Sequence, residues 1–332
     1  MVLTKLRVEI GFGACEELRE TRKAMRLHGL KLSAAMAGAL LVGAGSALAN
    51  EPTPMAIGPQ PAASAVAEQV TFFHNYVMVI ITIITVFVTL LLGWVILKFN
   101  AKANPTPAKF SHNTAIEVIW TIAPVLILFA IAIFSFPLLF TLDVEPTKQK
   151  LESGEYQEIA ADDWVTIKTY GRQWYWSYMI DFENTDGETE VVEFDARMIA
   201  GEDIASTPGA RRNLSTDNPL VLPQGKYIRM NLAASDVIHS WAMPAFRLKT
   251  DAVPGRLNQL WFKAEKVGTY YGQCSELCGR DHAFMPIEMR IVPQEQYDEW
   301  LRLAYDDIDA ATAYINQVAP RPAQLVRVAS AQ

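Results

Sequence analysis

Two long uncharged apolar runs constrain the fold of this chain more than any other feature. They cover residues 77–97 and 118–142. A helix rises about 1.5 Å per residue, so about 20 apolar residues cross the hydrocarbon core of a bilayer. The connecting segment 98–112 carries three lysines and no acid, which indicates a cytoplasmic loop. We therefore predict a two-helix transmembrane hairpin over 71–142, with both ends of the mature chain outside the cell membrane.

The N-terminal region is typical of a secretory signal peptide. A basic stretch precedes a small-residue apolar run at 33–45, and an A-x-A cleavage pattern ends at Ala49. We predict that residues 1–49 are the signal, with Met25 as an alternative start of translation. The competing interpretation is an N-terminal anchor helix, although the run is shorter than a bilayer requires. Residues 50–70 would then be an exported N-terminal segment.

Residues 143–293 are predicted to form an exported all-β domain. Short segments alternate polar with apolar or β-branched residues and are separated by Gly, Pro and Asn, at 164–170, 226–232, 258–264 and 287–292. Such strands indicate a β-sandwich or barrel. A helical tail is expected over about 294–318, followed by a loose Pro- and Ala-rich stretch up to 332. The net charge of −7 argues against a nucleic-acid partner.

The exported domain has two cysteines and two histidines, Cys274, Cys278, His239 and His282. They fall in or beside two segments, VIHSWAMP and GQCSELCGRDHAFMP. Three interpretations compete for the cysteines. A disulfide is usual in an oxidising periplasm. A zinc site usually has tighter cysteine spacing and longer histidine spacing than these. Electron-transfer copper sites combine thiolate, imidazole and thioether ligands.

The complete pattern C-x3-C-x3-H-x2-M with a remote histidine is more specific than any of its parts, and it favours copper. A blue-copper site needs one cysteine, two histidines and a weak axial methionine, so the second cysteine suggests two metals bridged by two thiolates. His239 with Met285, or His282 with a carbonyl, would be terminal ligand sets, and the sequence leaves their pairing open. A bridged pair shares one electron over two ions, which implies a one-electron relay with no substrate bond made or broken.

Longer motifs accompany this pattern. The hairpin and β domain, with GRQWYWSY, DVIHSWAMPAF, LKTDAVPGRLNQLWF and GQCSELCGRDHAFMP, together resemble subunit II of bacterial cytochrome c oxidases over about residues 70–300. The resemblance implies a cupredoxin fold that holds the binuclear copper centre CuA, with two copper ions per chain. Carried over position by position, the implied ligands are His239, Cys274, the backbone carbonyl of Glu276, Cys278, His282 and Met285.

The resemblance implies roles for two further residues near these motifs. The side chain of Glu276 would bind a magnesium ion shared with subunit I, where a carboxylate beside cations is stabilised; a solvated loop acid is the alternative. Trp174 would lie over the copper centre and receive the electron from cytochrome c; an ordinary aromatic residue of a strand is the alternative.

Glu117 stands at the predicted cytoplasmic mouth of the second span. The segment 114–117 fits a capping box, in which Thr114 and Glu117 satisfy backbone groups at the helix start. The resemblance implies that this acid opens a proton path leading into subunit I. Both interpretations can hold together, because an acid at a membrane boundary is often functional.

The segment 181–195 contains seven acids and no base. A solvated loop is the usual explanation for such a run. The resemblance implies a donor with a lysine-rich face, and acids near the electron-accepting Trp174 would then steer its approach. We predict a docking role for Asp181 and Glu183.

Together these features predict the subunit of a proton-translocating cytochrome c oxidase that takes electrons from cytochrome c. It would span the bacterial inner membrane more than once, with its C-terminal domain in the periplasm. The electron would pass from the copper centre to haem in subunit I, which also holds CuB and reduces oxygen; subunit III and the lipid bilayer are further expected neighbours. The competing hypotheses are a quinol-oxidase-type subunit without a working copper centre, and a membrane-anchored structural protein with a Cys274–Cys278 disulfide.

Overall fold

The computed structural model describes residues 50–322, apart from 51, 54, 107, 152 and 184–186. The predicted signal peptide, its cleavage after Ala49 and the tail from residue 323 onward lie outside these described residues.

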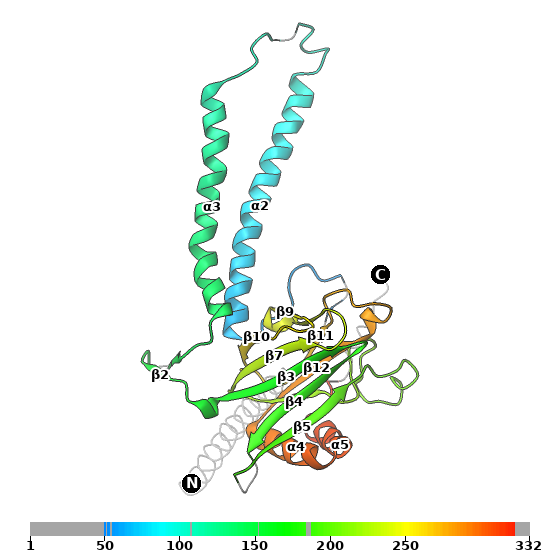
Figure 1. Cartoon of the computed structure of the whole chain (residues 1–332). Coiled ribbons are helices and arrows are strands. Elements are labelled where there is room, and N and C mark those ends of the chain that lie inside the picture. Colours follow the sequence, from blue (N-terminus) through cyan, green and yellow to red (C-terminus); the bar gives the residue numbers. More distant parts are fainter. Residues whose placement is uncertain are drawn as a thin grey trace, which may run out of the picture. The chain divides into compact units, whose positions relative to one another are not determined.

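The two apolar runs form the helices α2 (Ala65–Lys98) and α3 (Thr114–Asp143), which run side by side in Figure 1. The rings of Tyr76 and Phe134 meet between them at 5.0 Å. Most other side chains of both helices face outward, as expected of segments surrounded by lipid. Within the described residues these are the two helices long and apolar enough to cross a membrane, so the predicted hairpin is confirmed.

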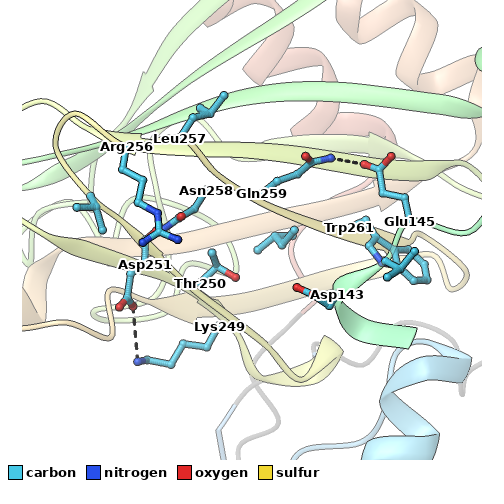
Figure 2. Close-up of a pocket in the computed structure, with 13 residues that line it drawn as sticks. Asp143, Glu145, Lys249, Thr250, Asp251, Arg256, Leu257, Asn258, Gln259 and Trp261 are labelled. Atoms are coloured by element: carbon cyan, nitrogen blue, oxygen red, sulfur yellow. Dashed lines mark hydrogen bonds and ion pairs between the residues drawn. The ribbon is translucent and has the colours of Figure 1, made fainter. Parts of the chain in front are cut away.

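The chain leaves α3 through a charged link to the β domain. Glu145 accepts two hydrogen bonds from Arg229, at 2.5 and 2.6 Å, and another from Gln259 (Figure 2). The Arg229 guanidinium also lies over the ring of Trp164 at 4.7 Å. This pairing holds the pKa of the Glu145 carboxyl below its usual value, because the hydrogen bond from Arg229 outweighs the effect of burial.

The larger sheet of the β domain has the strand order β10-β7-β3-β4-β5. The β3–β7 pair is parallel and the other neighbours are antiparallel. The strands predicted at 164–170, 226–232 and 258–264 are all confirmed in it. Its members are β3 (Trp164–Arg172), β4 (Tyr175–Glu183), β5 (Thr189–Ala196), β7 (Tyr227–Ala234) and β10 (Asn258–Lys263).

The second layer is built on a three-stranded sheet with the order β11-β12-β6, in which β12 and β6 are parallel. A separate antiparallel pair, β8 with β9, adjoins both sheets, and a small hairpin of β1 with β2 precedes the sandwich. The bounds are β6 (Leu220–Pro223), β11 (Gly268–Gln273), β12 (Pro286–Val292), β8 (His239–Met243), β9 (Leu248–Ala252), β1 (Lys148–Lys150) and β2 (Tyr156–Glu158).

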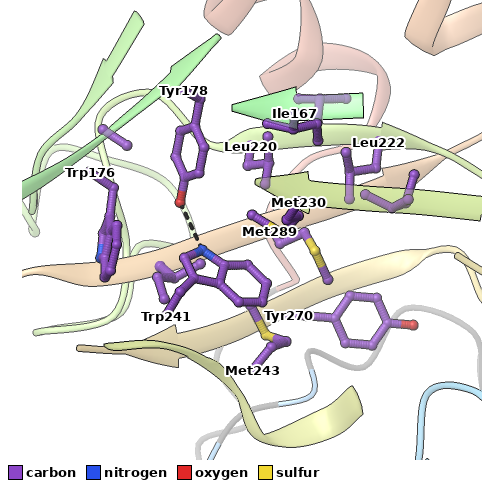
Figure 3. Close-up of a cluster of buried hydrophobic side chains, with 14 of the residues drawn as sticks. Ile167, Trp176, Tyr178, Leu220, Leu222, Met230, Trp241, Met243, Tyr270 and Met289 are labelled. Atoms are coloured by element: carbon purple, nitrogen blue, oxygen red, sulfur yellow. Dashed lines mark hydrogen bonds between the residues drawn. The ribbon is translucent and has the colours of Figure 1, made fainter. Parts of the chain in front are cut away.

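The core lies between these layers and draws on both (Figure 3). Trp241 of β8 donates a hydrogen bond from its indole N–H to the Tyr178 hydroxyl of β4 at 3.3 Å. Because both groups are buried, this bond satisfies polar atoms that would otherwise cost free energy. Other buried members are Ile167, Leu220, Leu222, Met230 and Met289.

The helical tail expected over 294–318 is two helices, α4 (Gln294–Asp306) and α5 (Ile308–Val318). The break falls at Asp307, whose carboxylate accepts from the backbone N–H groups of Asp309 and Ala310 and so starts a new helix. Trp300 of α4 is fully buried and packs against Phe194 of β5 at 5.9 Å.

The loose stretch predicted after α5 is anchored as far as Pro322. The buried carboxylate of Glu288 accepts hydrogen bonds from Arg290 at 2.8 Å and from Arg321 at 2.9 Å. Arg321 also donates to the carbonyl of Thr216 at 2.8 Å. A buried carboxylate needs such partners, so this cluster ties the C-terminal segment and the connection between β5 and β6 to the sheet.

Candidate metal centre

The loop 274–285 connects the antiparallel strands β11 and β12. Strand pairing brings Gln273 opposite Pro286, and the backbone N–H of Cys274 donates to the carbonyl of Met285 at 3.4 Å. The first and last candidate ligands of the loop are therefore adjacent. A second hydrogen bond, from the Ser275 N–H to the Ser240 carbonyl at 2.9 Å, fixes the loop to β8.

Four candidate ligand groups converge on the sulfur atoms of Cys274 and Cys278, which makes six candidate ligands in all. The Sγ atoms of Cys274 and Cys278 are 3.9 Å apart. Cys274 Sγ lies 3.9 Å from His239 Nδ1 and 3.4 Å from the Glu276 carbonyl oxygen. Cys278 Sγ lies 3.5 Å from His282 Nδ1 and 3.5 Å from Met285 Sδ. Every residue predicted from the C-x3-C-x3-H-x2-M pattern thus reaches the same place.

The donor set fits a pair of soft metal ions. A metal–thiolate bond is about 2.3 Å long, so two thiolates that share a metal lie within roughly 4.6 Å of each other, and the observed 3.9 Å satisfies this. A tetrahedral zinc ion would use four ligands, fewer than the loop supplies. Both cysteines of the described residues are free thiols, which disfavours the disulfide interpretation.

The two thiols differ in acidity. Burial raises the pKa of Cys274, but hydrogen bonds from His239 and from the backbone of Glu276 and Ser240 outweigh it, so the pKa is lowered. Burial and the negative charge of Cys274 raise the pKa of Cys278. Cys274 is therefore the more acidic thiol of the pair.

Asp236 orients the histidine that comes from outside the loop. Its carboxylate accepts from His239 Nε2 at 2.8 Å, from the backbone N–H of Val237 at 2.6 Å and from the backbone N–H of Gln173 at 2.7 Å. With Nε2 engaged by Asp236, Nδ1 is the ring nitrogen that faces the sulfur pair, 3.9 Å from Cys274 Sγ. Sequence reasoning missed this residue, although an acid three positions before a ligand histidine was a signal available for it.

Two glycines let the backbone approach the site closely. A Cβ atom added at Gly171 of β3 would lie 2.8 Å from the His239 ring, and one added at Gly272 of β11 would lie 2.0 Å from the Ala242 carbonyl oxygen. His239 is fully buried and meets the edge of the Trp176 ring at 6.0 Å. Strand β3 thus forms a close wall behind the imidazole.

Trp174, in the turn between β3 and β4, contacts the loop directly. Its indole N–H donates to the Cys278 carbonyl at 3.2 Å, and the Gln173 side chain donates to the same oxygen at 2.8 Å. The Arg280 guanidinium lies over the Trp174 ring at 5.2 Å. The predicted electron acceptor, Trp174, is therefore hydrogen-bonded directly to the backbone of a candidate ligand, Cys278.

The other predicted residues lie away from the sulfur pair or face outward. The Glu276 side chain is exposed while its carbonyl points to Cys274. Asp181 is about 20 Å along β4 from the Trp174 turn at 3.3 Å per residue and pairs with Lys168 at 2.8 Å. Glu183 is further still along the strand.

The capping box predicted at 114–117 begins one residue earlier. Asn113 is the N-cap, and its side chain accepts from the Ile116 N–H at 3.3 Å. Glu117 accepts from the Asn113 N–H at 3.3 Å. The reciprocal capping holds with asparagine in place of threonine, because Asn113 has the extended backbone that an N-cap requires.

An open hollow of about 990 Å³ lies between the end of α3 and strands β9 and β10 (Figure 2). Charged side chains line it, including Asp143, Lys249, Asp251 and Arg256. The motif LKTDAVPGRLNQLWF supplies most of this lining, so the third long motif of the sequence forms a polar surface beside the membrane hairpin.

A membrane-anchored β-sandwich with a two-cysteine, two-histidine centre defines the class of this protein. The model of the cytochrome c oxidase subunit II periplasmic domain matches residues 165–292, and that of its transmembrane domain matches residues 52–138. The chain belongs to the cytochrome c oxidase subunit II family, whose members are part of the oxidase complex. It is therefore a membrane-anchored protein with a periplasmic domain.

Two sequence relatives agree with this assignment. The probable cytochrome c oxidase subunit 2 of Rickettsia felis is 43% identical over 272 residues, which are 82% of this chain and 78% of the relative. Cytochrome c oxidase subunit 2 of Cereibacter sphaeroides is 41% identical over 77% of this chain and 82% of the relative. The crystal structure of the periplasmic domain of subunit II from Bradyrhizobium japonicum is 46% identical, covers 43% of this chain and 95% of that one, and has a TM-score of 0.37.

Proposed function

We propose that this subunit accepts electrons from cytochrome c at a binuclear copper centre and passes them to haem in subunit I. The observation that carries the proposal is the convergence of four further donor groups on two cysteine sulfur atoms that lie 3.9 Å apart. A copper pair held by these residues would supply the storage and release of one electron with little movement of the ligands. The completeness of this donor set also disfavours a quinol-oxidase-type subunit without a working copper centre.

The copper ligands in this proposal are His239, Cys274, the carbonyl of Glu276, Cys278, His282 and Met285. Cys274, Cys278 and Met285 are each at most 6% exposed, and His239 is fully buried. The loop therefore excludes water from the sulfur atoms, which limits the solvent reorganisation that accompanies a change of charge. Asp236 holds the His239 ring and leaves Nδ1 as the metal-binding nitrogen.

Trp174 is the electron acceptor on the protein surface in this scheme. It is partly buried against the loop and packs on the domain core, while its indole N–H contacts the Cys278 carbonyl. The exposed side chains of Leu277 and Phe284 lie in the same loop. Phe284 lines the hollow beside Trp174, and an exposed aromatic side chain at that place suits brief contact with the haem edge of cytochrome c.

Further assignments complete the proposal. The exposed Glu276 carboxylate would hold magnesium together with subunit I, and the charged hollow beside α3 would face that subunit. Glu117 would admit protons at the cytoplasmic end of α3. Asp181 and Glu183 would attract the lysine-rich donor from a distance. The hairpin would lie in the bacterial inner membrane, with subunit III as a further neighbour.

Electron uptake can be tested by stopped-flow mixing of reduced cytochrome c with the purified oxidase. Trp174→Phe should slow reduction of the copper centre by roughly 10²-fold, the cost of misplacing a reacting group by about 1 Å. Trp164→Phe is the matched control, because Trp164 lies at the other end of β3 and packs on Tyr227. Equal rates for wild type and Trp174→Phe would exclude this route of electron uptake.

A further inference from the structure

The Trp174 ring is covered on one face by an arginine of the copper loop. The Arg280 guanidinium lies 5.2 Å from the ring centroid and its side chain is 80% exposed. It also bonds the neighbouring Asp281 carboxylate, at 2.8 Å from Nη2 and 3.2 Å from Nε. The arginine is thus held in place while it remains open to the surface.

The loop backbone fixes this arrangement through Gly279. Its φ of +117° is a conformation that side chains disfavour. A Cβ atom there would lie 3.1 Å from Gln173 Nε2 and 3.2 Å from Trp174 Cζ2. The backbone at Gly279 therefore lies along the edge of the Trp174 indole, and the side chain of the next residue, Arg280, lies over the face of that ring.

The surface around Trp174 carries paired charges. Arg197 lies over the Tyr175 ring at 3.6 Å and bonds Asp195 at 2.7 Å. A hollow of about 370 Å³ beside Trp174 is lined by Arg197, Met198, Asp281 and Phe284. The carboxylates of Asp195 and Asp281 are already bonded to arginines, so they attract a lysine of an approaching protein less than free acids would.

We propose that Arg280 determines which electron donor the subunit accepts. Its guanidinium forms part of the surface that the donor touches, and it repels a lysine positioned over Trp174. It favours a donor that presents an acceptor oxygen, a carboxylate or backbone carbonyl, at the centre of its contact face. This inference rests on the proposed role of Trp174 as the electron acceptor.

The test compares Arg280→Gln with Arg302→Gln in the purified oxidase. Arg302 is an exposed arginine of α4 paired with Glu299 at 2.8 Å, so the control removes a similar ion pair elsewhere. With a lysine-rich mitochondrial cytochrome c, Arg280→Gln should lower KM about threefold, as expected for removal of one repulsive charge at a hydrated contact, and kcat should change less. The dependence of kcat/KM on ionic strength should become steeper.

A second electron donor distinguishes an electrostatic role of Arg280 from a structural one. With the same cytochrome c carrying acetylated lysines, Arg280→Gln and wild type should have equal KM values. A KM equal to that of Arg302→Gln with the lysine-rich donor would overturn the inference. So would a fall in kcat that is equal for both donors, because Arg280 would then act only by holding Trp174 in place.

The outcomes also distinguish this inference from the proposed function. If Trp174→Phe slows electron uptake while Arg280→Gln behaves like Arg302→Gln, only the inference about Arg280 fails. If Trp174→Phe leaves uptake unchanged, the proposed role of Trp174 fails, whatever Arg280→Gln does. Copper content measured in each variant shows that the compared proteins hold the same centre.

Discussion

The two ends of the β3–β4 hairpin are built from the same strands but have different surroundings. At the turn, Gln173 and Trp174 bond the Cys278 carbonyl, and the Gln173 N–H bonds Asp236. At the far end, Asp181 makes an exposed pair with Lys168. The turn is thus connected to the candidate metal centre through several hydrogen bonds, while the role proposed for the far end depends on charge alone. Substitutions that disturb the geometry at the turn should therefore have larger effects on electron uptake than substitutions that remove charge at the far end.

The largest effect is expected inside the loop. Cys278→Ser removes one of the two cysteine sulfurs, so the purified oxidase should lose copper and electron uptake. The loss should exceed the roughly 100-fold fall in metal affinity or activity that is caused by substituting residues outside the ligand set. Ser275→Ala is the control, because the Ser275 hydroxyl lies in the same loop and donates to the Gln273 carbonyl of β11 at 3.2 Å. Metal analysis and stopped-flow reduction measure both quantities. Wild-type copper content in Cys278→Ser would remove Cys278 from the ligand set.

Asp236→Asn should have the next largest effect. The amide keeps the shape but cannot accept from His239, Val237 and Gln173 together as the carboxylate does. We expect copper affinity to fall roughly 10- to 100-fold, measured by competition with a chelator. Nitrogen-15 NMR of the copper-free protein should also show a loss of the single His239 tautomer.

Asp163→Asn is the control for this change, since Asp163 forms an exposed pair with Lys226 at 3.5 Å. Unchanged affinity and an unchanged His239 tautomer in Asp236→Asn would show that the strand itself orients the ring.

A smaller effect is expected from Gly171→Ala. The added Cβ would meet the His239 ring at 2.8 Å, and overpacking of this kind costs about 1–3 kcal/mol. Thermal unfolding followed by the copper absorption should shift to lower temperature. Gly201→Ala provides the control, because no atom lies within 4 Å of a Cβ at that position. Equal melting temperatures in the two variants would mean that β3 can shift to accommodate the added methyl group without displacing the His239 ring.

The smallest effect is expected at the far end of the hairpin. Combined Asp181→Asn and Glu183→Gln should raise KM for lysine-rich cytochrome c by about twofold, because exposed charges contribute at most about 1 kcal/mol and are screened by salt. Steady-state kinetics at two ionic strengths would measure this change in KM and its dependence on salt. The same substitutions at Glu295 and Asp298 of α4 serve as the control. An unchanged KM would limit donor recognition to the turn.

The sequence predicted most of what periodicity and spacing can encode. Apolar runs define the hairpin, alternation defines the main strands, and the spacing of Cys274, Cys278, His282 and Met285 defines the loop because these residues are near neighbours. Asp236 was missed because its role depends partly on Gln173, which lies 63 residues earlier in the sequence, in the turn between β3 and β4. The anchoring of Arg321 by Glu288 was missed for the same reason, since a composition rich in Pro and Ala carries no sign of a buried partner.

The proposed electron relay requires that Cys274 and Cys278 together hold two copper ions. Electron paramagnetic resonance of the full-length subunit in the purified oxidase, with copper counted per chain, tests it most directly. We predict two copper ions at this centre and hyperfine splitting from one electron shared equally between two copper nuclei. A signal from a single copper nucleus, or cysteines oxidised to each other with no copper bound, would contradict the account.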